Sequence, residues 1–238
     1  MLNDIIAELE FQLQGAPAAA GAKATTPAAA PPAAAAAAAA TANLPAPPEA
    51  KAAAPDKGSK YTFDALVVPC ITDAKLVVGL LERVWPHPDG EKLFCEQVNV
   101  GEEEPRNIAS GLRAHYAQHE LEGRKVIIVA NLRAISLLGF KSHGMVLCGV
   151  EQLPDGSEGR VEIIEPPESA AVGTVVEVEG LDGGQPLSES KMAKTKAFKY
   201  IAENLRVDAE GSVAWRGHRL LVDGVALRSP TVREGIAR

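Results

Sequence analysis

The sequence predicts a mainly β protein: a five-stranded Greek-key barrel followed by a small C-terminal α+β module and preceded by a disordered Ala/Pro-rich segment. Short runs of apolar residues recur between turn signals over residues 61–165, which is typical of a small barrel. One helix-like stretch and several more short strands follow over residues 166–238. Residues 15–60 lack almost all bulky apolar side chains, so they cannot form a core.

Residues 1–14 are predicted to form an amphipathic helix. Leu2, Ile5, Ile6, Leu9 and Leu13 recur with the spacing of one helical face. A lone helix of about three turns is marginal in water, so two interpretations stay open. The helix docks on a partner or on a second copy of the chain, or it frays and packs weakly on its own domain. We favour docking, because the linker would separate the helix from any core.

The segment 15–60 is rich in Ala, Pro, Thr, Gly and Lys. Its alanine run at residues 33–40 favours a helix, but Pro31, Pro32 and Pro45 bracket that run. The run is also shorter than an isolated helix needs in water. We therefore expect a flexible tether that spans about 35–40 Å root-mean-square.

The barrel is expected over residues 61–165. Its first strand is the apolar run 76–85, in which Gly79 suits a bulge or a close approach of two strands. Four further strands are predicted between turn signals, at residues 93–100, 107–112, 125–130 and 145–150. The strand at residues 125–130 contains an unbroken apolar run, which indicates burial on both faces. Five such strands match the partly open barrel of the oligonucleotide-binding fold.

The C-terminal module is expected over residues 166–238. Alternating strands are predicted at residues 161–164 and 174–178, and a loop at 180–186. Residues 194–204 are predicted to form one helix, with Ala197 and Ile201 on its apolar side. Short strands complete the module around Val207 and at residues 213–215, 220–222 and 225–227.

The net charge of −7 opposes nucleic-acid binding only at first sight, because the charges are unevenly distributed. Residues 61–184 carry 10 basic and 20 acidic side chains, whereas residues 185–238 carry 10 basic and 6 acidic ones. A phosphate-facing surface is therefore expected towards the C-terminal end.

Cys70, Cys95 and Cys148 are scattered and odd in number, which predicts a reducing compartment without a disulfide framework. No apolar run approaches the ~18 residues of a membrane span, and the acidic N-terminus does not resemble a transit peptide. We therefore expect a cytoplasmic protein.

We expect neither a metal nor a cofactor, since the histidines lack the spacing of a ligand set. The sequence also lacks nucleophile, phosphate-loop and dinucleotide motifs, so we expect no catalysis.

Two blocks of sequence are the most diagnostic. The first contains Pro86-His87-Pro88-Asp89-Gly90 and then Ile108-Ala109-Ser110-Gly111-Leu112. The second contains Ala130-Asn131-Leu132-Arg133, then Gly139 and Ser142-His143-Gly144-Met145. Their order and spacing resemble the tRNA-binding domain family. The C-terminal module resembles the one that the endothelial-monocyte-activating polypeptide and some tyrosyl-tRNA synthetases carry, and the resemblance covers about residues 61–238.

The resemblance implies that the barrel holds tRNA without catalysis. In the family, the segment matching residues 131–145 lies on the rim of the barrel and contributes most of the tRNA contacts. The candidate RNA-binding residues on this rim are Asn131, Arg133, Lys141, Ser142, His143 and Met145. Ser136 and Leu138 stand where relatives usually carry basic side chains, which predicts weaker affinity and a weaker salt dependence. Alternatively, Met145 closes the barrel core and Ser142 caps a turn.

Further candidate phosphate donors lie outside the rim. Lys92 is expected at the foot of the second strand. The C-terminal candidates are Lys191, Lys194, Lys196, Lys199, Arg216 and Arg219. The alternative is that these lysines form an ordinary solvated face. Phe94 is expected either to offer a surface stacking platform or to belong to a second packed layer.

The resemblance, together with these residues, implies a non-catalytic tRNA-binding protein, an accessory factor that brings tRNA to one or more aminoacyl-tRNA synthetases. It would dock on the enzyme through residues 1–14 or through the barrel and so raise the local concentration of tRNA. The alternative is a protein-interaction scaffold in a synthetase complex, with weak nucleic-acid affinity. The acidic middle region and the uncharged Ser136 and Leu138 support this alternative.

Overall fold

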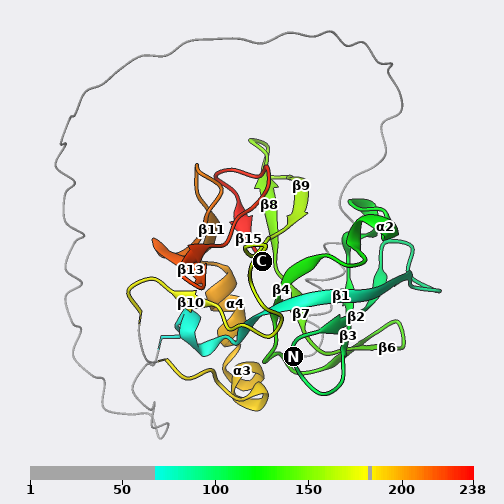
Figure 1. Cartoon of the computed structure of the whole chain (residues 1–238). Coiled ribbons are helices and arrows are strands. Elements are labelled where there is room, and N and C mark those ends of the chain that lie inside the picture. Colours follow the sequence, from blue (N-terminus) through cyan, green and yellow to red (C-terminus); the bar gives the residue numbers. More distant parts are fainter. Residues whose placement is uncertain (1–67, 182–183) are drawn as a thin grey trace, which may run out of the picture. The chain divides into compact units, whose positions relative to one another are not determined.

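The computed structural model describes residues 68–181 and 184–238, which belong to one compact unit. The predicted N-terminal helix, the Ala/Pro-rich segment and the first residues of the predicted barrel domain lie outside the described residues. The described chain is mainly β with a few short helices, as the sequence predicts (Figure 1). In this part of the chain no helix is long and apolar enough to cross a membrane.

The five-stranded barrel is confirmed. Its strands are β1 (Leu76–Pro86), β2 (Phe94–Asn99), β3 (Arg106–Ser110), β4 (Lys125–Val129) and β7 (Met145–Val146). They pair antiparallel in the order β3-β2-β1-β4-β7, and β3 also lies against β7, so the sheet is nearly closed (Figure 1). The bulge in β1 lies between Leu81 and Arg83, just beyond Gly79. Gly79 allows the close approach instead, because a Cβ there would lie 2.9 Å from side-chain carbons of Ile128 and Val98.

Strands β1 and β4 are buried on both faces. Alternate side chains pack into the barrel core: Val77, Val126 and Ile128. The side chains between them pack into a second core: Leu76, Val78, Ile127 and Val129. The C-terminal part completes this second core with Trp215, Leu220 and Ile201. Because side chains alternate across a strand, one pair of strands supplies both cores and joins the two halves of the fold.

Phe94 belongs to the barrel core and is only 3% exposed, so the packed-layer alternative is confirmed and the surface platform is wrong. Its neighbours Cys95 and Glu96 are also buried, which shows that β2 is covered on both sides. Cys148 is buried as well, and burial raises the pKa of its thiol to about 12. Cys95 and Cys148 are therefore core residues, as their place in apolar strands indicates.

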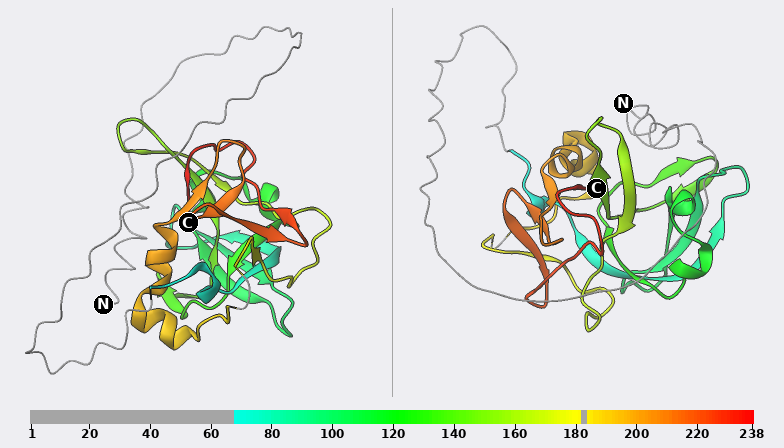
Figure 2. Two further views of the ribbon diagram at one scale, coloured as in Figure 1. Left: turned by 90° about the vertical axis from the view of Figure 1, so that its left-hand side faces the viewer. Right: turned by 90° about the horizontal axis from the view of Figure 1, so that it is seen from above.

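A second sheet combines residues 148–163, from the end of the predicted barrel range, with strands of the C-terminal part. Its strands are β8 (Cys148–Gln152), β9 (Glu158–Ile163), β10 (Glu177–Val178), β11 (Leu205–Val207), β12 (Val213–Trp215), β13 (His218–Val222), β14 (Val225–Ala226) and β15 (Ile236–Ala237). They follow the order β10-β13-β12-β11-β15-β8-β9, with β14 beside β13. Because β8 follows β7 directly after Leu147, the last barrel strand continues into this sheet. Figure 2 shows the orange and red strands as a layer beside the green and cyan barrel.

The helices are short: η1 (Ile71–Asp73), η2 (Leu112–Ala114), α2 (Gln118–Leu121), α3 (Glu189–Thr195) and α4 (Ala197–Ala202). The prediction of one helix over residues 194–204 is wrong, because Lys196 adopts a left-handed conformation (φ 52°) and separates α3 from α4. Met192 and Ala197 are both buried, yet in a continuous helix their five-residue spacing would place them about 140° apart. The break lets both helices bury an apolar face.

Glu162 on β9 fixes the segment before β15. Its Oε1 accepts hydrogen bonds from the Ser229 hydroxyl (2.5 Å) and from the backbone N–H groups of Thr231 and Val232 (both 2.6 Å). Its Oε2 accepts from the Thr231 hydroxyl at 2.8 Å. Burial raises the pKa of this carboxyl, but the hydrogen bonds from Ser229, Val232 and Thr231 outweigh burial and hold the pKa below its ordinary value.

We expect Glu162→Gln to lower the free energy of unfolding by roughly 2–4 kcal/mol at pH 7, because an amide cannot accept all four hydrogen bonds. The depressed native pKa means that the stabilisation is complete above the unfolded pKa and is lost as pH falls through the native pKa. The difference from wild type should therefore shrink on acidification. Urea unfolding between pH 3 and pH 8 measures it. The exposed Glu168→Gln is the control, and an equally large loss there would contradict the assignment.

Glu96 on β2 carries another carboxyl, but its pKa is raised, whereas that of Glu162 is lowered. It is fully buried, and the Ser110 hydroxyl donates to its Oε1. Among the described residues nothing hydrogen-bonds its Oε2. Burial raises the pKa of Glu96 to about 8, against which the bond from Ser110 is the smaller effect, so the group is protonated at neutral pH.

We expect Glu96 to make the protein less stable as pH rises from about 5 to 8. Over this range the unfolded chain ionises the carboxyl while the folded barrel keeps it neutral. Glu96→Gln stays neutral in both states, so its stability relative to wild type should rise by roughly 1–4 kcal/mol over the same range. Urea titrations at several pH values give this difference. A constant offset between the two proteins at every pH would contradict the prediction.

Candidate nucleic-acid interface

The rim of the barrel carries a separate hairpin. Strands β5 (Ile135–Leu137) and β6 (Phe140–Ser142) pair with each other and form a two-stranded sheet outside the barrel sheet (Figure 1). Arg133 precedes the hairpin and Lys141 lies in β6, and both side chains are exposed. Within the described part of the chain neither forms an ion pair, so both can meet an anionic ligand.

Asn131 is buried and holds the rim to its neighbours. Its Oδ1 accepts from the backbone N–H of Lys75 (2.8 Å). Its Nδ2 donates to the carbonyls of Asp73 (2.8 Å) and Leu187 (2.9 Å). The amide therefore hydrogen-bonds within the protein and links the rim to η1 and to the segment before α3.

Ser142 and Met145 also face inward. The Ser142 hydroxyl is buried, accepts from the backbone N–H of Ala109 (3.0 Å) and lies 3.4 Å from the carbonyl of Gly144. Met145 is half-buried, pairs with Val129 and packs against the second core. Both residues support the rim from inside the protein. Met145 packs against the second core and not the barrel core that the alternative expected, and the closer bond of Ser142 runs to Ala109 on β3.

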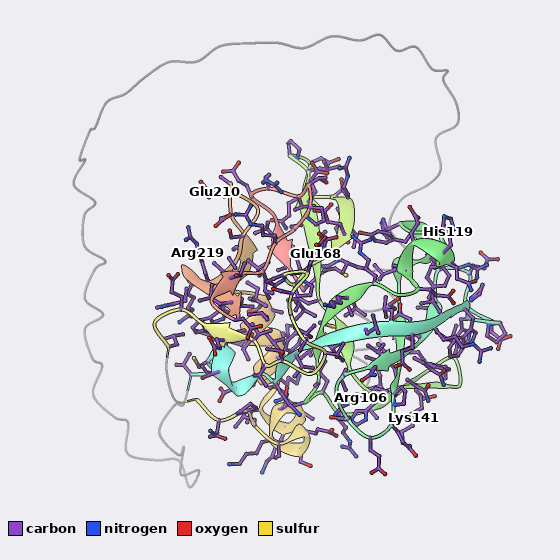
Figure 3. All side chains as sticks on the ribbon, viewed as in Figure 1. Arg106, His119, Lys141, Glu168, Glu210 and Arg219 are labelled. Atoms are coloured by element: carbon purple, nitrogen blue, oxygen red, sulfur yellow. The ribbon has the colours of Figure 1, made fainter. Side chains whose placement is uncertain are left out.

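Arg106 is a rim residue that the sequence did not reveal. Its guanidinium forms a bidentate ion pair with Glu102 (2.7 and 2.6 Å), and its Nη1 donates to the Ala130 carbonyl (2.6 Å). The same nitrogen lies 3.4 Å from the carbonyl of His143. Figure 3 shows Arg106 and Lys141 together at one edge of the barrel. Arg106 therefore joins the two ends of the rim segment, and its hydrogen bonds lower the pKa of Glu102.

His143 connects the rim to α3. Its Nε2 lies 2.7 Å from Oε1 of Glu189, the first residue of α3, and its backbone N–H donates to the carbonyl of Asn107 (2.8 Å). Together with the bond from Asn131 to Leu187, this contact fixes the start of α3 against the barrel. The first turn of the lysine-bearing helix thus lies next to the rim.

The predicted lysines line this helical segment. Lys191 and Lys194 lie on α3, Lys196 at the break and Lys199 on α4, and all four are exposed. Lys191 and Lys194 are three residues apart and so project from the same side of α3. The break at Lys196 separates these two lysines from Lys199 on α4.

The two arginines of the C-terminal part differ. Arg216 donates through Nε to Asn204 Oδ1 (3.2 Å) and through Nη2 to the Tyr200 hydroxyl. Its guanidinium also lies 5.1 Å from the ring centroids of both Tyr200 and Trp215, so it is held against α4. Arg219 is exposed and lies across the molecule from Lys141 (Figure 3).

Lys92 stands apart from the rim cations in sequence, in the turn between β1 and β2, and is half-buried. His87 builds the same turn from inside. Its Nδ1 accepts from the backbone N–H of Asp89 (3.1 Å), and its ring meets the edge of Phe140 at a centroid distance of 6.3 Å.

An acidic wall borders the rim. The loop between β2 and β3 places Glu102, Glu103 and Glu104 along a groove of about 520 Å³, and Lys141 and His143 line the same groove. Glu102 is paired with Arg106, whereas Glu103 and Glu104 are exposed. Phosphates are therefore attracted to one side of Lys141 and repelled from the other.

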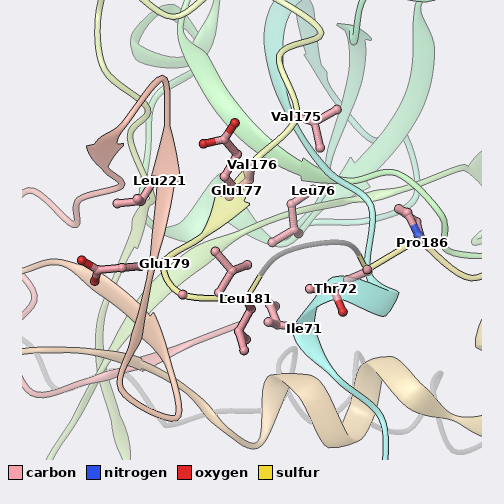
Figure 4. A pocket seen from close by; sticks show the side chains of 14 residues that line it. Ile71, Thr72, Leu76, Val175, Val176, Glu177, Glu179, Leu181, Pro186 and Leu221 are labelled. Carbon is pink, nitrogen blue, oxygen red and sulfur yellow. The ribbon is translucent and has the colours of Figure 1, made fainter.

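A second hollow, of about 510 Å³, lies between η1 and β10 (Figure 4). Ile71, Leu76 and Leu181 line its centre, and the carboxylates of Glu177 and Glu179 lie at its margin (Figure 4). Its described lining contains acids and no lysine or arginine, so it does not suit a phosphate.

Comparison with known proteins agrees with this geometry. The family model described as "Putative tRNA binding domain" matches residues 76–175. The solved structure of the C-terminal domain of Plasmodium vivax p43 is 33% identical, covers 71% of this chain and 99% of its own, and superposes with a TM-score of 0.64. The chain belongs to the tRNA-binding domain family. In this tRNA-binding domain the match includes both the barrel strands and the rim hairpin.

Longer relatives contain a similar segment. Cytoplasmic tyrosine--tRNA ligase of Danio rerio is 32% identical over 191 residues, which are 80% of this chain and 35% of that protein. Aminoacyl tRNA synthase complex-interacting multifunctional protein 1 of Cricetulus griseus is 31% identical over 174 residues, which are 73% and 44% of the two chains. This chain therefore spans between a third and a half of these relatives' lengths.

We expect Asn131→Ala to destabilise the tRNA-binding domain by roughly 1–3 kcal/mol, because three partly buried backbone groups lose their partner. Thermal and urea unfolding measure this loss. The matched control is Asn107→Ala, whose exposed side chain makes no hydrogen bond with another described residue and should change stability by less than about 0.5 kcal/mol. A fully stable Asn131→Ala would show that the rim does not depend on this amide.

Proposed function

We propose that this chain is a non-catalytic tRNA-binding protein that serves as an accessory factor of aminoacyl-tRNA synthetases. The observation that carries the proposal is the 2.7 Å contact between His143 and Glu189, since it joins the cationic rim to the lysine-bearing α3. Membership of the tRNA-binding domain family supports tRNA as the ligand.

The cations suggest how tRNA would be held. Arg133 and Lys141 on the rim and Lys191 and Lys194 on α3 are exposed and would contact phosphates. Lys196, Lys199 and Lys92 extend this set, and Arg216 and Arg219 are more distant contributors. Such contacts read the shape and backbone of RNA with little base selectivity, and their affinity falls as salt rises.

The accessory role follows the relatives, one of which is named for its interaction with a synthetase complex. We propose a division into a docking helix (1–14), a tether (15–60), the barrel (61–165) and the C-terminal module (166–238). Docking through residues 1–14 would hold tRNA near a synthetase and raise its local concentration. A cytoplasmic location fits the ligases that are named as cytoplasmic.

The second candidate is a protein-interaction scaffold with weak affinity for nucleic acid. It is favoured by the exposed Glu103 and Glu104 beside Lys141, which weaken any phosphate contact there. In this case synthetase binding would persist when the cations are removed.

We expect Lys141→Ala and Lys194→Ala each to weaken tRNA binding and to lower the slope of log K against log salt by about 1, because each removes one counterion-releasing contact. Arg219→Ala removes the same charge from a more distant contributor, far from Lys141, and should lower the affinity and the slope less than the other two variants. Fluorescence titrations from 50 to 300 mM salt measure all four proteins.

Three results would oppose the proposal. Wild-type protein without salt-dependent tRNA binding at ~50 mM salt would remove tRNA as the ligand. Equal salt slopes for all variants would show that the phosphate contacts lie elsewhere than on the rim and α3. Capture of a synthetase that is independent of Lys141 and Lys194, together with absent tRNA binding, would favour the scaffold.

A further inference from the structure

Three hairpins of the described chain turn through two residues of the form X-Gly. They are Leu138-Gly139 between β5 and β6, Arg216-Gly217 between β12 and β13, and Asp223-Gly224 between β13 and β14. In all three both residues have a positive φ, between 47° and 88°. This turn strongly prefers Asn, Asp or Gly at its first position, because other side chains crowd the backbone there. Asp223 follows the preference, whereas Arg216 and Leu138 do not. The contacts of Arg216 explain its place, since it donates to Asn204 Oδ1 and to the Tyr200 hydroxyl. A leucine side chain can form no such bond.

Burial does not explain Leu138 either. Its side chain is 58% exposed, against 52% for Val225 and 51% for Val175, the next most exposed large apolar residues of the described chain. An apolar residue that is both strained and exposed stabilises neither the turn nor a core. What favours Leu138 must therefore lie outside the folded chain.

The rest of the hairpin packs against β1. The Phe140 ring meets Trp85 edge-on at a centroid distance of 6.0 Å, and Trp85 carries the guanidinium of Arg83 at 5.2 Å. The hairpin tip thus projects from a fixed base with exposed cations around it: Arg83 on β1, Arg133 before β5 and Lys141 in β6. A ligand for this site must offer anionic groups and an apolar surface side by side.

We propose that Leu138 packs against the face of an unpaired nucleobase while Arg133 and Lys141 hold the flanking phosphates. This inference rests on the proposed function and adds a preference for looped or single-stranded RNA over duplex. In RNA only an unstacked base presents an open apolar face next to phosphates. A leucine contacts that face without reading its edges, so the site accepts any of the four bases.

The test uses the full-length protein with Leu138→Asn. Asparagine suits the turn, so the melting temperature should rise by about 2–4 °C. Affinity for tRNA should nevertheless fall by about 3–10-fold, with an unchanged salt slope, because no phosphate contact is lost. Leu138→Met keeps the apolar tip and should bind like wild type. Val225→Thr, which alters an equally exposed apolar residue at another hairpin, should change neither quantity.

A matched pair of RNAs sharpens the test. With a hairpin RNA that has an unpaired loop, Leu138→Asn should weaken binding. With a fully paired duplex of the same number of phosphates, it should have no effect. Equal binding of the loop RNA by Leu138→Asn and wild type would overturn the inference, and so would a changed salt slope.

Unchanged RNA affinity with loss of a synthetase partner would assign Leu138 to a protein contact and also overturn it. These outcomes leave the proposed function intact. Its failure is seen separately, as wild-type protein that binds neither RNA, and that result would remove this inference with it.

Discussion

The alternation of side chains along β1 and β4 is the constraint on which the structure depends. One set of residues fills the barrel, and the intervening set fills the core shared with the C-terminal part. A shift of one residue in either strand would exchange the two sets and disrupt both cores together. The barrel and the C-terminal part are therefore held in a fixed relation, and this relation lets cations from two distant parts of the sequence share one surface.

Buried and partly buried polar side chains support this surface from inside the protein. Asn131, Ser142 and Arg106 each satisfy backbone groups at an end or bend of the rim. Removing one of them leaves partners unpaired in a region of low polarity, which costs more than a single surface hydrogen bond would contribute. The exposed cations need no such support of their own. The rim therefore contains two kinds of residue, some that hydrogen-bond within the protein and some that project into solvent.

The sequence predicted the architecture well, because strand alternation, turn residues and unbroken apolar runs follow directly from burial. It located the barrel strands and the double burial of residues 126–129. It failed where a side chain's role depends on contacts between distant segments. The break at Lys196 follows from two helical faces that must both meet the same core. Arg106 acquires its role only where β3 meets the rim, and Glu189 only where the rim meets α3, and no local pattern marks either residue. Phe94 was undecided because β2 is covered on both sides by segments far away in the sequence.

The three consecutive glutamates beside Lys141 make the charge uneven along this edge of the molecule. A polyanion that approaches over the acidic part of the barrel meets repulsion, whereas one that approaches over α3 meets attraction. Encounters are thereby oriented before any contact forms, although the protein as a whole carries a charge of −7. Such steering acts over roughly a Debye length, about 8 Å at physiological salt. A polyanion close to this edge would therefore respond to the local charges and not to the sign of the total charge.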